Sequence, residues 1–305
     1  MVNQKCITTT KLCRDILKIP KEELLALLAD RQSYYVPFEK KKITAGGRVK
    51  IRTIEPPHGY LKRVLKKINT TVLQPQMERL PYGVMGGRKG YSVVDNAKYH
   101  ASSPALMKYD IKDFFPSIKY VDVFHIFRCQ LNYCEEAANI LAHLTTFENS
   151  QHGVHVPQGS PTSMSIAIFA VEKMSCVVDD YCRKNGLKFS IWVDDITISG
   201  PYDRLCRHRS TINHMLNSTH YRINPDKDSG IVRKGQKGRS VTGVIISNDG
   251  RLTVGHSKLS RLRRQVKHST RPSDKLRGRL QFLLQVNKSQ ARRLVHEYTE
   301  KHRKN

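Results

Sequence analysis

Two adjacent carboxylates, Asp194 and Asp195, stand between two runs of residues that alternate in polarity, 188–192 and 196–199. If these runs pair as a β-hairpin, the turn between them presents both carboxylates at the end of a buried sheet. The two charges repel each other, and a divalent cation relieves that repulsion. Mg²⁺ prefers carboxylate oxygen and keeps positions open for water and substrate phosphates. Taken alone, such a pair is more typical of an Asx-type surface turn.

A third carboxylate, Asp110, closes the apolar, strand-like run 105–111. Three carboxylates on adjacent strands suit an arrangement in which two ions about 3.5–4 Å apart activate an attacking oxygen and stabilise a leaving one. A second acidic pair, Asp179-Asp180, lies in a helical pattern, where consecutive side chains point in different directions. We expect that pair to face solvent and to bind no ion.

The elements that must position these acids follow from the hydrophobic pattern. Apolar periodicity predicts helices over 11–30 with an interruption at Pro20, over 60–73, two within 121–147, one over 163–184, and a helical stretch after 255. Alternation predicts a hairpin over 38–54 that turns at Gly46-Gly47, a strand over 105–111, a strand–turn–strand unit over 188–199 and two strands over 238–254. This order is typical of an α+β fold with a helical, basic C-terminal part.

The segment 156–163 lies between the two acidic stretches and contains Gln158-Gly159 followed by serines and a threonine. Gly159 permits close approach of the backbone to a ligand, and free N–H groups at the following helix start can bind phosphate or sugar. An ordinary helix N-cap is the alternative. His152 and His155 precede this segment, and we expect both in a loop because no cysteine or acidic cluster accompanies them.

Four motifs occur in the order and approximate spacing of the palm motifs of reverse transcriptases: YDIKDFFPSI (109–118), PQGSPTS (157–163), WVDDITISG (192–200) and INPDK (223–227). Two more segments, the N-A-x-x-H element at 96–100 and the V-T-G element at 241–243, resemble the elements of bacterial retron reverse transcriptases. The resemblance runs from the R-x-I-x-x-P pattern at 52–57 to 287, about four-fifths of the chain.

This resemblance implies a catalytic set of Asp110, Asp194, Asp195 and Lys227, with two Mg²⁺ ions as cofactors. The three aspartates resemble the metal-binding triad, and Ile111 is counted with them in the metal-binding set. Lys227 resembles the lysine beside the pyrophosphate leaving group, where a cation or general acid lowers the barrier.

The resemblance also implies a site for the incoming deoxynucleoside triphosphate. Arg52 resembles the fingers residue that grips the triphosphate, and Phe115 resembles the steric gate against a ribose 2′-OH. Gln158 and Gly159 resemble the residues that pack on the nascent base pair and the sugar. Trp192 departs from the tyrosine or phenylalanine usual at its position; either core packing or an altered position of the primer strand accounts for it.

Six residues are candidates for RNA binding: Asn96, His100, Thr242, Arg261, Arg264 and Arg277. His100 with Asn96, and Thr242, come from the two retron-like elements; a structural histidine and a plain strand residue are the alternatives. The arginines belong to the basic segment 258–279, which carries nine Lys/Arg and one acid, Asp274. A thumb that follows duplex phosphates is the preferred interpretation, and a solvated basic helix is the alternative.

The implied architecture is a right-hand polymerase with fingers, a palm with an antiparallel sheet, and a helical thumb. The expected boundaries are N-terminal helices and fingers at 1–104, the first part of the palm at 105–120, a helical insertion of fingers and palm at 121–156, the palm at 157–250, and the basic thumb at 251–305.

Composition agrees with a nucleic-acid partner. Lys and Arg number 53 against 26 Asp and Glu, a formal net charge of +27, and 39% of residues are hydrophobic. Such charge favours a polyanionic partner, with an acidic membrane surface as the rival. No apolar stretch reaches the roughly 20 residues of a spanning helix. Seven cysteines without a C-x-x-C pair predict neither a disulfide framework nor a zinc knuckle, and favour the cytoplasm.

The leading hypothesis is an RNA-directed DNA polymerase of the retron type, which copies part of a cognate structured RNA into single-stranded DNA (msDNA) from a 2′-OH primer. Kinship implies an effector protein as a partner in anti-phage defence. A group II intron-type reverse transcriptase is one alternative, although little chain follows the thumb for a maturase or endonuclease domain, or for a ribonuclease H region. A non-catalytic RNA-binding scaffold with a palm fold is the other.

Overall fold

The computed structural model describes residues 6–43, 49–228, 230–268 and 273–303. The chain forms two compact units, each assembled from separate segments. The first contains Met1–Arg88, Ile111–Val177 and Asn217–Ile223; the second contains Lys89–Asp110, Val178–Leu216 and Asn224–Asn305. Within the described residues, no helix is both long and apolar enough to span a membrane.

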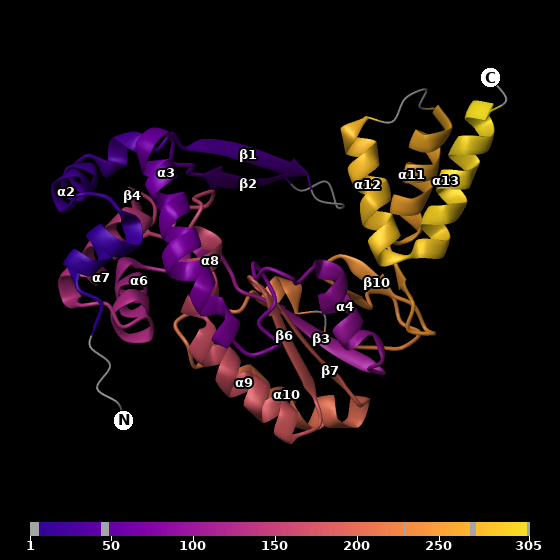
Figure 1. The fold of residues 1–305 in the computed structure, drawn as a ribbon. Helices are drawn as coiled ribbons and strands as arrows, with labels where there is room; N and C mark the ends of the chain where they lie inside the picture. The colour runs from indigo at the N-terminus through magenta and orange to yellow at the C-terminus, as the bar shows by residue number, and fades with distance from the viewer. Residues whose placement is uncertain (1–5, 44–48, 229, 269–272, 304–305) are drawn as a thin grey trace. The chain divides into compact units, whose positions relative to one another are not determined.

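A four-stranded antiparallel sheet is the centre of the second unit (Figure 1). Its order is β6 (Lys188–Trp192), β7 (Asp195–Gly200), β3 (Ala105–Asp110) and β8 (Ile231–Arg233). Strands β3 and β7 are buried along most of their length, although β7 keeps the polar residues Thr197 and Ser199 between its apolar ones. The predicted strand over 105–111 and the strand–turn–strand unit over 188–199 are confirmed.

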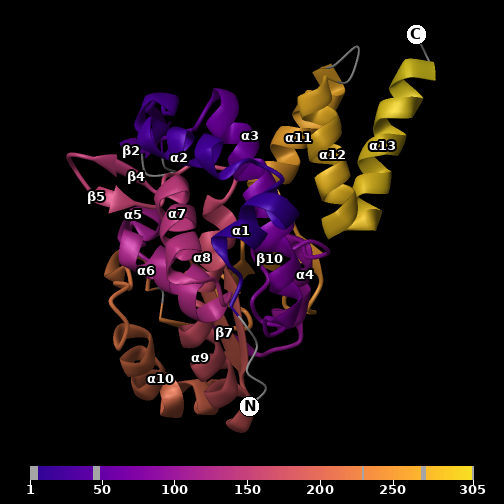
Figure 2. The ribbon, with the colours of Figure 1, turned by 60° about the vertical axis from the view of Figure 1, so that its left-hand side comes forward.

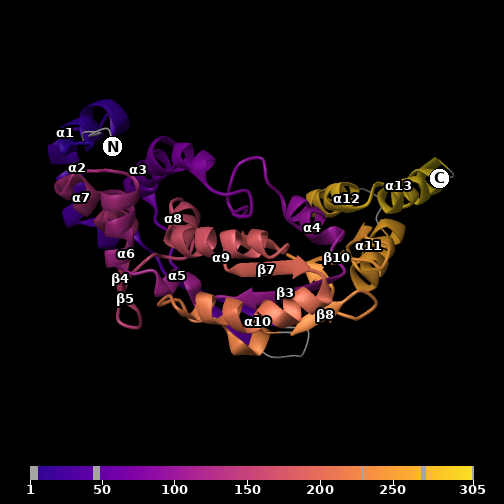
Figure 3. The same ribbon diagram turned by 90° about the horizontal axis from the view of Figure 1, so that it is seen from below.

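Helices cover both faces of this sheet. Helix α4 (Val93–Ala101) begins at a capping box, in which Ser92 and Asp95 exchange hydrogen bonds. Helix α10 (Tyr202–Asn217) runs along the other face, as Figure 3 shows, and its Asn213 accepts a hydrogen bond from the Tyr109 hydroxyl at 2.6 Å.

A second, three-stranded sheet consists of β9 (Ser240–Val241), β10 (Val244–Ile246) and β11 (Leu252–Thr253). The two strands predicted over 238–254 around the turn Asn248-Asp249-Gly250 are present as β10 and β11, and β9 is an additional strand that the prediction did not include. Thr242 and Gly243 both have positive φ, 45° and 80°, and such a pair forms a tight hairpin turn that divides the first predicted strand into two.

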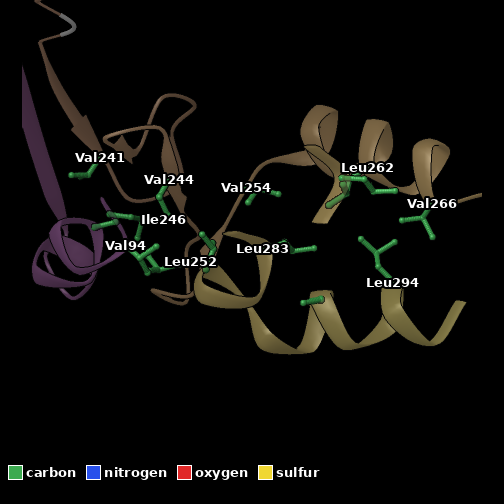
Figure 4. Close-up of a cluster of buried hydrophobic side chains, with 14 of the residues drawn as sticks. Val94, Val241, Val244, Ile246, Leu252, Val254, Leu262, Val266, Leu283 and Leu294 are labelled. Carbon is green, nitrogen blue, oxygen red and sulfur yellow. The ribbon is translucent and has the colours of Figure 1, made fainter. Parts of the chain in front are cut away.

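The helical stretch predicted after 255 consists of three helices: α11 (His256–His268), α12 (Asp274–Val286) and α13 (Lys288–Arg303). Their apolar stripes join one core with α4 and the small sheet, shown in Figure 4, where Leu262, Leu283 and Leu294 meet. This shared core fixes the three helices to the small sheet and to α4.

The first unit begins with α1 (Thr9–Lys11), the π-helix η1 (Leu12–Leu17), α2 (Lys21–Ala29) and η2 (Arg31–Tyr34). Strands β1 (Phe38–Ile43) and β2 (Val49–Ile54) form the predicted hairpin, with Phe38 opposite Ile54. Its predicted turn, Gly46-Gly47, lies outside the described residues. The predicted helix over 60–73 is α3 (Gly59–Ile68) with η3 (Asn69–Leu73), followed by η4 (Gln74–Arg79).

The rest of the first unit is mainly helical (Figure 2). It contains α5 (Phe114–Ser117), α6 (Tyr120–His125), η5 (Ile126–Gln130), α7 (Glu135–Thr145), the strand pair β4 (Phe147–Asn149) and β5 (Gly153–His155), and α8 (Ser163–Ala170). The single helix predicted over 163–184 was wrong: it is α8 and α9 (Glu172–Lys184), because the backbone leaves helical geometry at Val171.

Candidate active site

Strand register brings the three aspartates together. In the antiparallel pairing of β3 with β7, Asp110 lies directly opposite Asp195, and Asp194 occupies the turn that leads into β7. One ligand atom from each carboxylate lies within 4.8 Å of the other two. The convergence expected from the sequence is therefore present, and it is built entirely within the second unit.

The turn that carries Asp194 contains an unusual backbone conformation. Val193, between β6 and β7, has φ of 62°. A β-branched residue is rarely found there because its side chain crowds the backbone, and such strain is often located at functional sites. The strain persists because five residue pairs between the two strands fix the turn from both sides.

Asp110 is held by two partners from the segment around η6 (Pro225–Lys227). The residue is 4% exposed, and its side chain accepts hydrogen bonds from Lys227 and, at 3.4 Å, from the Asn224 amide. The Asn224 backbone N–H also donates to the Asp110 carbonyl at 2.7 Å. Lys227 thus offsets part of the negative charge, and Asn224, which no prediction included, orients the same carboxylate.

The electrostatics of the cluster favour a cation. Loss of hydration, followed by repulsion from Asp194 and Asp110, raises the pKa of Asp195 to about 6. Three carboxylates supply only hard oxygen ligands, the kind that Mg²⁺ prefers, so the donor set fits a divalent ion. Ile111, the next residue after Asp110, has only its backbone carbonyl to offer, and its place in the metal-binding set remains a prediction.

Asn96 and His100 lie on α4, and their side chains contact strands β6 and β7 of the four-stranded sheet. Both side chains are 0% exposed. The His100 ring nitrogens lie 2.7 Å from Ser199 Oγ and 2.8 Å from Ser190 Oγ, and Ser190 donates to the Asn96 side chain at 2.7 Å. This burial supports the alternative of a structural histidine, because neither side chain offers surface to RNA. Desolvation lowers the pKa of His100 to about 3.

Thr242 occupies the left-handed turn between β9 and β10, with its hydroxyl donating to the Val93 carbonyl at 3.1 Å. Thr242 is therefore a turn residue that connects the small sheet to α4. The alternative interpretation, a plain strand residue, was wrong. Its half-buried side chain leaves a role in RNA binding as a prediction.

The residues predicted to bind the nucleotide belong to the first unit. Arg52 is exposed on β2 opposite Lys40, and Phe115 is half-buried in α5. The Gln158 carbonyl accepts from the Glu55 N–H at 2.7 Å, and Gly159 has φ of 115°. A Cβ on Gly159 would lie 3.0 Å from the Ile54 side chain, so both the conformation and the neighbour require glycine.

A buried pair of polar side chains in hydrogen-bond contact was missed by the sequence reasoning. Glu55 and His155 are 3% and 0% exposed, with Glu55 Oε2 at 3.0 Å from His155 Nε2. Asn149 donates to the other Glu55 oxygen at 2.6 Å, and His155 Nδ1 lies 2.8 Å from the Gly153 carbonyl. The expectation of a loop residue was wrong for His155, which closes β5. The only sequence signal was an acid inside the R-x-I-x-x-P pattern.

The second acidic pair, Asp179-Asp180 on α9, also differs from its prediction. Asp180 is exposed, but Asp179 is 8% exposed and pairs with Arg183 at 3.3 Å. Burial raises the pKa of Asp179. Placing both acids in solvent was thus wrong for Asp179, because a charged neighbour one helical turn away offsets its desolvation.

The predicted basic surface is present on α11 and α12, where Arg261, Arg264 and Arg277 are exposed. Trp192 is half-buried at the end of β6, opposite Asp195.

Comparisons with known proteins agree with this geometry. A family model described as "Reverse transcriptase (RNA-dependent DNA polymerase)" matches residues 40–246. The retron Ec86 reverse transcriptase of Escherichia coli is 28% identical over 280 residues, covering 89% of this chain and 82% of the relative. The retron Mx65 reverse transcriptase of Myxococcus xanthus is also 28% identical, covering 87% of this chain and 64% of its own length.

The retron Se72 reverse transcriptase of Salmonella heidelberg is 27% identical; the match covers 71% of this chain and 57% of the relative. The chain thus spans less than two-thirds of two of these three relatives. Among solved structures, the telomerase of Candida albicans, in complex with a fragment of telomeric RNA, covers 92% of this chain and 58% of its own, with 12% identity and a TM-score of 0.52. That likeness supports the right-hand polymerase fold.

Proposed function

Because the chain belongs to the reverse transcriptase family of RNA-directed DNA polymerases, we propose that it copies a cognate structured RNA into single-stranded DNA in the manner of its retron relatives. The single observation that supports this most is the meeting of Asp110, Asp194 and Asp195 on paired strands. The finer parts of the proposal are the msDNA product, priming from a 2′-OH, location in the cytoplasm, and action with an effector protein in defence against phage.

Asp110, Asp194 and Asp195, with the Ile111 carbonyl, would hold two Mg²⁺ ions. Bound there, the ions would supply an activated primer oxygen and stabilisation of the leaving pyrophosphate. The protein residues do the positioning: the β3–β7 register fixes the carboxylates, and Asn224 holds Asp110 in one orientation. Lys227 donates a hydrogen bond to Asp110, which places its Nζ where it would meet the charge that develops on the leaving group.

We assign the deoxynucleotide to the residues of the first unit. Arg52 presents a guanidinium fork suited to the triphosphate, and Gly159 leaves room for the sugar. Phe115 would occupy the volume that a ribose 2′-OH requires. Gln158 would pack against the nascent base pair, supported from behind by its backbone hydrogen bond with Glu55.

We further assign the right-hand parts to the boundaries expected from the sequence: fingers within 1–104, palm at 105–120 and 157–250 around the insertion 121–156, and thumb at 251–305. The exposed arginines Arg261, Arg264 and Arg277 of the thumb would contact RNA phosphates. Thr242 would lie at the edge of that surface.

An extension assay tests the proposal. Purified protein is given Mg²⁺, deoxynucleotides and the RNA that co-purifies with it, and the product is sequenced. We expect synthesis by the wild type and a loss of at least ~1000-fold in the Asp194→Asn, Asp195→Asn double variant, because metal ions supply several kcal/mol of transition-state stabilisation.

Asp180→Asn is the matched control, since it changes an exposed acid that takes no part in the cluster, and it should leave synthesis unchanged. No synthesis by the wild type would instead favour a non-catalytic scaffold. Synthesis from a separate DNA or RNA primer, without a branched product, would favour the group II intron-type alternative.

A further inference from the structure

Between α11 and α12 lies a hollow of about 430 Å³ that the proposed polymerase mechanism does not use. We call it the thumb groove. Its lining includes Leu262, Leu283 and the half-buried Phe282 from the two helices. Because these side chains belong to the core that joins the thumb to the small sheet, the base of the groove is apolar and fixed in place.

Cations surround this apolar base. Lys258, Arg261, Lys275 and Arg279 line the groove, and none of its lining residues carries a carboxylate. Arg279 is oriented by a hydrogen bond of 2.6 Å to Gln265. A ligand that fits has a flat apolar part and adjoining negative charge.

A glycine in the middle of α12 indicates that the groove is kept open. Gly278 lines the groove, yet a Cβ at this position would meet no atom within 4 Å, so packing does not require glycine. Glycine weakens a helix interior relative to alanine. Its presence at an open position is explained if a ligand approaches the helix backbone there.

A second hollow of about 250 Å³ adjoins the thumb groove and shares Gln265, Lys275 and Arg279 with it. His268 and Ser273 contribute to its lining, so it is more polar. Together, the two hollows provide an apolar binding surface next to a polar, cationic one.

We propose that the thumb groove binds an unpaired nucleotide of RNA, with the base against Phe282 and its flanking phosphates at the surrounding cations. A duplex presents its phosphates to a protein and keeps its bases stacked inside, so it would leave the apolar base of the groove without a partner. An unpaired base exposes a π-face that stacks on aromatic side chains. The proposal extends the proposed function, since RNA is the polyanion that such a polymerase must hold before synthesis begins.

Binding of a short fluorescein-labelled oligouridylate, followed by anisotropy at fixed salt, tests the groove directly. Gly278→Leu fills the groove with a good helix former, so its melting temperature should rise while the oligonucleotide binds about tenfold more weakly. Phe282→Leu retains an apolar contact but removes the ring, and we expect a loss of about fivefold or more. Leu284→Ala is the control, because Leu284 is exposed on the same helix and does not line the groove.

Two further probes, a duplex RNA and a single-stranded DNA, decide the identity of the occupant. A duplex RNA of equal length should bind all variants as it binds the wild type. Unchanged oligouridylate affinity in both Gly278→Leu and Phe282→Leu would overturn the proposal. Equal losses for the matching single-stranded DNA would overturn its assignment to RNA.

The Asp194→Asn, Asp195→Asn variant separates this proposal from the proposed function. It should bind oligouridylate like the wild type, because its changes lie outside the groove. Full extension activity in that variant would contradict the polymerase mechanism alone, while groove variants with unchanged binding would contradict the groove alone.

Discussion

A buried histidine can stabilise a sheet by remaining neutral, and His100 does so here. Both of its nitrogens meet serine hydroxyls, one on β7 and one on β6, and no surface of the side chain is exposed. Protonation would place an unpaired charge among these groups and near Lys188, whose charge also lowers the pKa. The residue thus links α4 to the two strands that lead into and out of the Asp194 turn.

This burial predicts a pH-dependent stability. The folded pKa of His100 is about 3, against 6.5 for a free side chain. Above pH 6.5 the imidazole is neutral in both states and the stabilisation is complete. As the pH falls below 6.5 the unfolded chain gains a proton that the folded chain does not bind, so the free energy of unfolding falls by up to about 1.4 kcal/mol per pH unit.

His100→Gln cannot take up that proton, so its unfolding free energy should depend less on pH between 6 and 4 than that of the wild type. Urea unfolding at a series of pH values measures the two slopes. His125→Gln, a change in a histidine of the other unit, serves as the control. Parallel curves for wild type and His100→Gln would contradict the argument.

At the scale of elements, the Glu55–His155 pair connects β2 to the segment before α8. Nδ1 of His155 lies 2.8 Å from the Gly153 carbonyl, and Nε2 lies 3.0 Å from Oε2 of Glu55, so both ring nitrogens have a partner. Arg52 lies three residues before Glu55, and Gln158 three residues after His155. The pair and the Glu55–Gln158 backbone bond therefore hold two predicted nucleotide-binding elements in one arrangement.

Breaking this pair should affect both stability and nucleotide binding. Glu55→Ala leaves His155 and Asn149 without their buried partner, and we expect a loss of about 3 kcal/mol in unfolding free energy. The KM for deoxynucleotide should rise more than kcat falls, because the carboxylates proposed to be catalytic belong to the other unit. Unfolding curves and steady-state kinetics of the single and double Glu55→Ala, His155→Ala variants measure both effects.

Exposed Glu148→Ala, on the neighbouring strand β4, is the control. In the double variant the two stability losses should be clearly less than additive, since each substitution removes the same contact. Additive losses would mean that the two side chains act independently.

At the scale of the whole molecule, the net charge of +27 governs association with RNA. A protein that neutralises several phosphates releases as many counterions, and its affinity falls steeply with salt. Arg264→Ala and Arg277→Ala, both outside the thumb groove, should each reduce the slope of log K against log salt by about 0.9 for a duplex or 0.7 for a single strand.

Fluorescence anisotropy over a range of NaCl concentrations measures these slopes. Phe282→Leu should lower the affinity without changing the slope, because it removes no charge. A slope unchanged by both arginine substitutions would place the phosphate contacts elsewhere on the basic surface.

Local sequence determined the elements and the identity of the acids proposed to be catalytic. The alternation over 188–199 required a hairpin whose turn holds Asp194, and strand ends at Asp110 and Asp195 follow from the same period of two. Such patterns are readable because backbone geometry repeats over a few residues. The break at Val171 and the turn at Thr242-Gly243 were missed, since each depends on one or two residues adopting an irregular conformation.

Only the tertiary structure decided which side chains meet. The register that sets Asp110 opposite Asp195 and the partners that enclose His100 and Glu55 join residues far apart in the chain. No local pattern encodes these contacts, because burial and pairing depend on how distant segments pack. The sequence therefore specified the chemistry, and packing specified which polar residues serve the site and which support the fold.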